Sequence, residues 1–149
     1  FTDEAENFDF EITHVTLAFA PGAAYFLPVT TEKVLMALKP VLENENIRKV
    51  GHNIKASLLA LKKHDIQTRG PLFDTMLAHY LIEPEASHDL GIICGQYLHY
   101  QLSEETTGTE AYCERADQIL QLKSKLQTEL EQRGQWRLLH DVEMPLARV

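Results

Sequence analysis

Apolar and polar residues alternate along two neighbouring stretches near the start of the chain, residues 12–20 and residues 23–29. A period of two is typical of a β-strand with one buried face. Pro21 and Gly22 stand between the two stretches and form a turn signal. The pattern therefore predicts a β-hairpin.

Further along the chain the apolar spacing changes to three and four residues, which is typical of amphipathic helices. The first expected helix is capped by Thr30 or Thr31, and Pro40 inside it predicts a kink or a division into two pieces. A short strand is expected at residues 47–51, and Ile66 is placed in a short extended piece. Strands followed by alternating helix and strand predict an α/β fold. The expected helices cover residues 34–42, 54–63, 74–82, 89–98, 110–132 and 138–149.

Within the helix expected at residues 74–82, the inner face is assigned to Met76, Leu77, Tyr80 and Leu81. Trp136 is interpreted as an anchor that packs the last two helices together. Gly134 lies between those two helices and is expected to end the first of them.

Composition narrows the function classes. The 149 residues are enough for one domain with a core, and no apolar run approaches the roughly 18 residues that span a bilayer. No secretory signal opens the sequence, so a cytoplasmic location is expected. Cys94 and Cys113 lack a metal-binding spacing and are predicted to be buried free thiols. The net charge of −8 indicates that any contact with DNA is local or is supplied by a neighbouring domain.

Residues 50–84 read VGHNIKASLLALKKHDIQTRGPLFDTMLAHYLIEP. This stretch resembles the 3′–5′ exonuclease domain of bacterial DNA polymerase I (family A), whose members carry VGxNxKYD…RGxxFDTMLxxYLxxP. Residues 15–29 are similar to the family's hairpin, residues 112–122 (YCERADQILQL) to its YAAEDADxTLQL block, and the ending EMPLARV to its EMPLxxVL. The blocks occur in family order and cover most of the chain.

The resemblance implies a ribonuclease-H-like exonuclease fold, in which helices flank a mixed sheet, with its first strand clipped. Residues 1–149 would form a single exonuclease-like domain within a longer polymerase that acts in DNA replication or repair. The implied partners are DNA, through that polymerase, and the polymerase domain that would follow in the same chain. No membrane partner is implied.

The family's chemistry, as the resemblance implies it, is two-metal phosphodiester hydrolysis with Mg²⁺ or Mn²⁺ held by four carboxylates. The family's ligand positions fall here on Phe1, Asp3, Ser57 and Arg115. A further family aspartate, which is not a ligand, falls on Asp117. Three of the four carboxylates are thus replaced, one of them by a cation, so no catalytic residue, metal or cofactor is expected and the domain's role is expected to be structural.

Two other interpretations stay open at this stage. The first is an active proofreading exonuclease with carboxylates rearranged from Asp3, Glu4, Glu6, Glu114 and Asp117, of which Asp3, Glu114 and Asp117 are the candidate metal ligands. The second is an α/β interaction module unrelated to polymerases.

Several remaining residues have both a functional and a structural interpretation. Asn53, Lys55 and Arg69 are candidate DNA contacts, but Asn53 is also a candidate N-cap and Arg69 a candidate loop anchor. Asp74 of the FDT motif is predicted to cap the helix that follows it. The seven histidines show no metal-binding spacing and are expected at the surface or half-buried.

Overall fold

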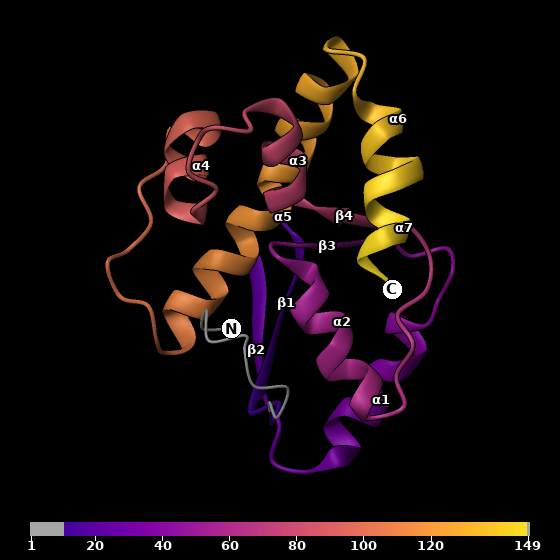
Figure 1. The fold of residues 1–149 in the computed structure, drawn as a ribbon. Helices are drawn as coiled ribbons and strands as arrows, with labels where there is room; N and C mark the ends of the chain where they lie inside the picture. Colours follow the sequence, from indigo (N-terminus) through magenta and orange to yellow (C-terminus); the bar gives the residue numbers. More distant parts are fainter. Residues whose placement is uncertain (1–10, 149) are drawn as a thin grey trace.

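A computed structural model gives the structure of residues 11–148 (Figure 1). The predicted hairpin is present, with β1 (His14–Ala20) paired antiparallel to β2 (Ala23–Pro28) and Thr16 opposite Phe26. Gly22 has a φ of 74°, a backbone conformation that favours glycine over residues with a side chain. The local alternation of the sequence is therefore sufficient to define this part of the fold.

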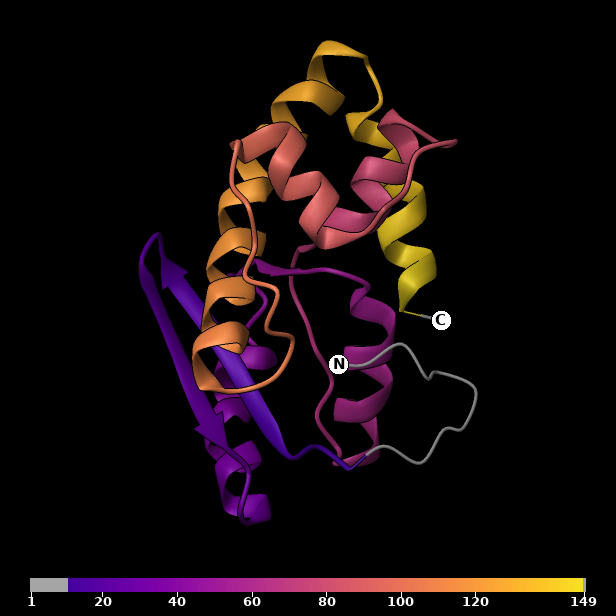
Figure 2. The same cartoon turned by 90° about the vertical axis from the view of Figure 1, so that its left-hand side faces the viewer.

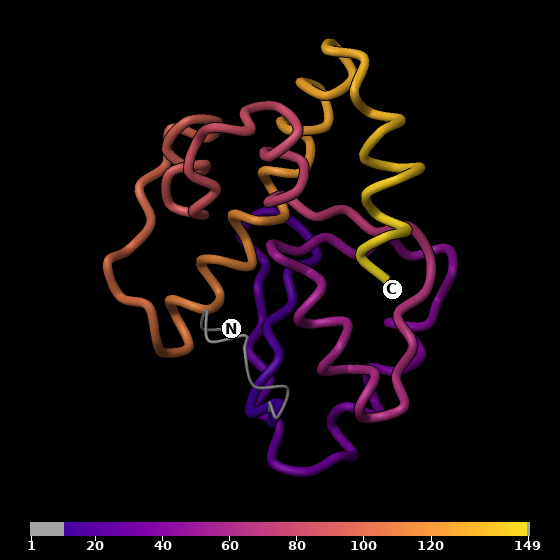
Figure 3. Tube along the Cα trace, in the orientation of Figure 1, coloured from indigo at the N-terminus to yellow at the C-terminus, as the bar shows by residue number. Residues whose placement is uncertain are grey.

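A second, parallel pair of strands lies in the middle of the domain. β3 (Lys49–Gly51) pairs with β4 (Leu72–Asp74), with Val50 opposite Phe73, and α2 (Ile54–Lys63) makes the crossover between them. β4 was not predicted, because its three residues are all buried and too few to show a period of two. The segments that precede the two strands also run side by side (Figure 3), and the N–H of Lys49 donates to the carbonyl of Pro71.

The helices follow the sequence periodicity closely, and the strands plus helices make the α/β fold that was predicted. α2 begins and ends where the sequence placed it. The alternative that Pro40 divides the first helix into two pieces is wrong, because one continuous helix contains Pro40 in its last turn and the Glu43 N–H donates to the Lys39 carbonyl. The other helical elements are α1 (Glu32–Leu42), α3 (Thr75–Ile82), α4 (Leu90–Leu98), α5 (Thr109–Gln132), α6 (Trp136–Leu138), the π-helical segment η1 (Leu139–Glu143) and α7 (Met144–Ala147).

The long helix α5 is the element around which the others pack. It contacts both strands of the hairpin, β3, α3 and α4, and Figure 2 shows it between the hairpin and the rest of the domain. Its residues Leu122, Leu126 and Leu130 are completely buried in the main core. A second, smaller core joins Ile12 and Ile66 to α1 and α2. The predicted extended piece at Ile66 is not a strand, although its side chain is buried.

The inner face predicted for α3 is only partly confirmed, because Leu77 and Leu81 pack against the main core but the most buried side chains are others. The buried side chains are Thr75, Ala78, His79 and Ile82, which follow helical spacing, whereas Tyr80 is 49% exposed. The error arose because apolar type was taken as the guide, although the buried face of this helix consists mainly of small and polar residues.

The C-terminal helical segment is anchored through Trp136, whose ring stacks on Phe73 of β4 with 6.1 Å between centroids. Both cysteines are free, but only Cys94 is fully buried, and burial raises its pKa to about 11. Cys113 is half-buried, contrary to the prediction. None of the helices between residues 11 and 148 combines the length and the apolar character that crossing a bilayer requires.

Candidate functional site

The turn after β3 and the start of α3 are joined by one buried carboxylate. Asp74 is 1% exposed, and its Oδ1 accepts from the N–H groups of Asn53 (3.0 Å), Met76 (2.8 Å) and Leu77 (3.4 Å). Its Oδ2 accepts from the Ile54 N–H at 2.7 Å. Because the first N–H groups of a helix have no partner within the helix, one anion here caps two helices. The N-cap prediction for Asp74 is confirmed, and its contact with α2 was missed.

The N-cap prediction for Asn53 is wrong with respect to its side chain. Asn53 occupies the N-cap position of α2 with a left-handed backbone (φ 55°), and its side chain makes no capping hydrogen bond. The carboxylate of Asp74 already accepts the available N–H groups, and asparagine tolerates this backbone conformation. Thr75 completes the junction, because its Oγ1 donates to the Gly51 carbonyl and lies 2.9 Å from Nδ1 of His52.

Ser57 lies in the first half of α2, downstream of this junction, and is half-buried. A neutral hydroxyl is a weak ligand for Mg²⁺, which prefers carboxylate oxygens. Lys55 on the same helix is exposed. Arg69 also has an exposed side chain, while its N–H donates to the Leu42 carbonyl at 3.0 Å. The backbone of Arg69 therefore anchors its loop and leaves the guanidinium at the surface.

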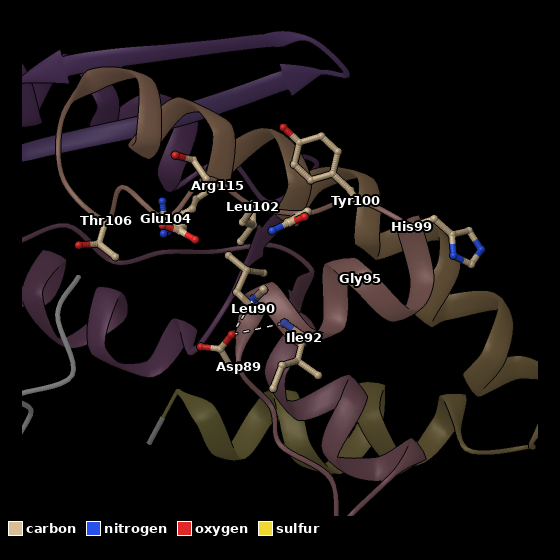
Figure 4. A pocket seen from close by; sticks show the side chains of 13 residues that line it. Asp89, Leu90, Ile92, Gly95, His99, Tyr100, Leu102, Glu104, Thr106 and Arg115 are labelled. Atoms are coloured by element: carbon tan, nitrogen blue, oxygen red, sulfur yellow. Dashed lines mark hydrogen bonds between the residues drawn. The ribbon is translucent and has the colours of Figure 1, made fainter.

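Arg115 projects from α5 into a hollow of about 690 Å³ between the start of α4 and residues 99–106. Figure 4 shows its side chain beside Glu104 and Thr106. The guanidinium Nη1 donates to the carbonyls of Glu105 (2.9 Å) and Ala111 (3.3 Å). Arg115, for which the family resemblance predicts a former ligand position, is thus a cation hydrogen-bonded to the loop before α5 and to the first turn of α5.

The two candidate carboxylates on α5 are bound to different parts of the domain. Glu114 accepts from the Tyr100 hydroxyl (2.8 Å) and from the Ser103 N–H (3.1 Å), and the hydrogen bond raises the pKa of Tyr100. Asp117 accepts from the N–H of Gly22 at the hairpin turn (2.9 Å).

No group of three or more His, Cys, Asp or Glu side chains is arranged to hold a metal ion within residues 11–148. Four of the positions considered from the sequence lie outside this range, so the structure does not place them. These are Phe1, Asp3, Glu4 and Glu6.

A pair formed by the buried His79 and the half-buried His88 was not predicted. His79 is completely buried in α3, and its Nδ1 lies 2.8 Å from Nδ1 of His88. The ring of Tyr97 packs edge-on against His79. Burial, and secondarily the charge of His88, lowers the pKa of His79 below its ordinary value of 6.5. The expectation that all seven histidines lie at the surface or half-buried is therefore wrong. The available signal was helical spacing, since His79 follows Thr75 by four residues.

Comparison with known proteins supports the family resemblance. A sequence profile described as 3′–5′ exonuclease matches residues 2–121. DNA polymerase I of Bacillus subtilis is 31% identical over 142 residues, which cover 85% of this chain and 16% of the polymerase. DNA polymerase I of Pseudomonas aeruginosa is 30% identical over 173 residues, which cover 93% of this chain and 19% of the polymerase. The chain thus spans less than a fifth of the length of these relatives.

Solved structures of similar proteins also support the predicted fold. The polymerase domain of Pol1 from M. smegmatis, in complex with a DNA primer-template and dNTP, superposes with a TM-score of 0.80 and 27% identity over 91% of this chain and 24% of that chain. NrnC from Brucella melitensis bound to pGG superposes with a TM-score of 0.65 and 22% identity over 84% of this chain and 74% of that chain. The ribonuclease-H-like fold is confirmed, and the chain belongs to the family of 3′–5′ exonuclease domains of bacterial DNA polymerase I.

Proposed function

We propose that this chain is a catalytically silent exonuclease-like domain with a structural role in a family A DNA polymerase. The observation that carries the proposal is Arg115, a cation at a family ligand position whose guanidinium is hydrogen-bonded to Glu105 and Ala111 carbonyls. The partners of this domain would be the polymerase domain of the same protein and, through that polymerase domain, DNA. We expect the parent protein to act in the cytoplasm.

The electrostatic argument concerns the free energy of binding two divalent ions. Near a protein surface two unit charges about 4 Å apart interact with roughly 4 kcal/mol, and the interaction doubles for a divalent ion. A carboxylate at position 115 would contribute this attraction, whereas Arg115 reverses its sign. Ser57 contributes no charge at all. The dehydration of Mg²⁺ or Mn²⁺ is then left without the interactions that offset it.

An active site built from the other carboxylates has less support. Glu114 holds the loop after α4, and Asp117 holds the hairpin turn, so each is already hydrogen-bonded to a different part of the domain. We retain Lys55 and Arg69, which are exposed, as proposed DNA contacts. Asn53 joins them because its side chain makes no capping bond.

A nuclease assay tests the proposal directly. The full chain is incubated with a 3′-labelled single-stranded oligonucleotide and Mg²⁺ or Mn²⁺, and product lengths are compared with those in EDTA. We expect no metal-dependent shortening. The matched control is Glu114→Gln/Asp117→Asn, which removes the two candidate metal ligands on α5. Shortening by the wild type that EDTA and this double substitution both abolish would contradict the proposal, whereas a contaminating nuclease would persist in the variant.

A further inference from the structure

The point where β3 begins gathers positive charge on a protein whose net charge is −8. Arg48, which precedes β3, and Lys123 of α5 line one hollow of about 450 Å³ together with Asn46, Val50, Pro71 and Leu120. Arg48 is exposed and Lys123 is half-buried. Burial, and then the charge of Arg48, lowers the pKa of Lys123, against a smaller opposing effect of the Glu131 charge. Two like charges therefore face one hollow.

A second pair of cations lies next to the first. Neighbouring residues of an extended chain point to opposite faces, so Lys49 points away from Arg48. The Lys49 ammonium donates to the carbonyls of Asn44 and Arg69, each at 2.5 Å, and Arg148 donates to the Gly70 carbonyl. Burial, and then the charge of Arg148, lowers the pKa of Lys49. Figure 1 shows α7, which precedes Arg148, beside the two strands.

Within residues 11–148 none of these four side chains forms an ion pair, and the two that make hydrogen bonds donate to carbonyl oxygens. Glu131 offsets part of the charge of Lys123. Because like charges that lie close together repel one another, a ligand that brings negative charge would relieve the remaining repulsion. We name the lining of the hollow the β3 basic surface, and its cations are Arg48 and Lys123, whereas Lys49 and Arg148 form the neighbouring pair.

We propose that the β3 basic surface binds the phosphate backbone of a nucleic acid, with one phosphate seated in the hollow between Arg48 and Lys123. Guanidinium and ammonium groups are the side chains that neutralise backbone phosphates, and the Asn46 amide in the same lining adds a neutral donor. The choice of nucleic acid among polyanions rests on the proposed function.

The β3 basic surface is separate from the degenerate exonuclease site. The two parallel strands begin at the basic surface and end at Gly51 and Asp74, where the turn into α2 and the start of α3 lie. Ser57 follows that far end of β3. Binding here would therefore position a strand along the domain without bringing it to the former catalytic ligands.

Salt-dependent binding tests this inference on the full chain. The affinity for a short fluorescent DNA duplex is measured in EDTA by anisotropy for the wild type, Arg48→Gln/Lys123→Gln and the charge-matched control Lys33→Gln/Lys62→Gln. Each phosphate contact contributes about 0.9 to the slope of log affinity against log salt. We expect the slope to fall by about 2 in Arg48→Gln/Lys123→Gln only, so that its deficit shrinks about tenfold between roughly 50 and 200 mM salt.

Two further measurements keep the result unambiguous. Arg48→Lys/Lys123→Arg preserves both charges and is expected to keep the wild-type slope, and thermal melts check that every variant is folded. Equal slopes for the Arg48→Gln/Lys123→Gln variant and its control would overturn the inference. So would tighter binding of poly-L-glutamate than of DNA, which would assign the surface to an acidic protein. Because EDTA removes any metal, this binding test can fail while the nuclease assay still supports a silent domain, and the reverse also holds.

Discussion

Asp74 and Ser57 belong to the same motif stretch, residues 50–84, but they differ in how many backbone contacts depend on them. Asp74 is buried and accepts hydrogen bonds from four backbone N–H groups that belong to two helices. Ser57 lies half-buried on α2, where the helix backbone accepts many residue types. The comparison distinguishes a carboxylate that the fold uses, Asp74, from a position that we propose served only the chemistry, Ser57.

The same division holds on α5. Arg115, which we propose stands at a former ligand position, donates to the Glu105 carbonyl, and its neighbour Glu114 binds the same loop. Both side chains thus tie the loop after α4 to α5. These contacts support the structural role that we propose for the domain.

The largest expected effect comes from removing the structural carboxylate. Asp74→Ala leaves four backbone donors without their acceptor, two of them at a second helix, and should lower the free energy of unfolding by about 3 kcal/mol. Chemical denaturation measures the loss. The matched control is Asp89→Ala, which removes an exposed N-cap that serves α4 alone and should cost about 1 kcal/mol. Equal losses of unfolding free energy in the two variants would contradict the special role of Asp74, because Asp74 would then act as an ordinary N-cap.

A pH effect on stability should come from the buried His79 and its neighbour His88. The pKa of His79 is lowered in the fold by burial and then by His88, so the unfolded chain takes up a proton more readily. The stabilisation is complete above the ordinary value of 6.5 and is lost as the pH falls below it. Unfolding free energies measured between about pH 8 and pH 5 should therefore decrease on the acid side.

His79→Gln should flatten this pH dependence, whereas His140→Gln, which changes an exposed histidine, should leave it unchanged. An unaltered slope in His79→Gln would assign the acid sensitivity to other groups.

A smaller effect is expected at Glu114. Glu114→Gln weakens the bonds from Tyr100 and Ser103 and should cost about 1 kcal/mol. The pKa of Tyr100, which the hydrogen bond to Glu114 raises, should fall back toward its ordinary value, as followed by ultraviolet titration. Glu110→Gln in the first turn of the same helix serves as the control. If Tyr100 titrates alike in both variants, Glu114 is not the anchor of the loop.

Much of the fold could be predicted because local patterns determine it. The alternation of residues 12–29 and the spacing in residues 54–63 fix the hairpin and α2 without long-range information. β4 and the buried face of α3 could not be predicted, since three buried residues show no period and His79 is polar. The motif assigned the N-cap role of Asp74, but its bonds to Asn53 and Ile54 depend on how β3 and β4 pair.

The candidate site was predicted only as far as the family resemblance reached. Ser57 and Arg115 were placed by counting along motifs, and nothing in their local sequence indicates a metal site or its loss. The bond from Arg115 to the Glu105 carbonyl joins residues ten apart in the chain and depends on the loop conformation. The like-charge pair of Arg48 and Lys123 could not be predicted from the sequence either, because the two residues come together only when α5 packs on β3.

Calorimetric titration of Mn²⁺ into the full chain tests the central claim most directly. The account predicts no saturable heat for the wild type and a measurable binding heat for Ser57→Asp/Arg115→Asp, which restores two carboxylates and removes a cation. Saturable binding of Mn²⁺ to the wild type, as strong as to this variant, would show that other groups hold the metal and would contradict the account.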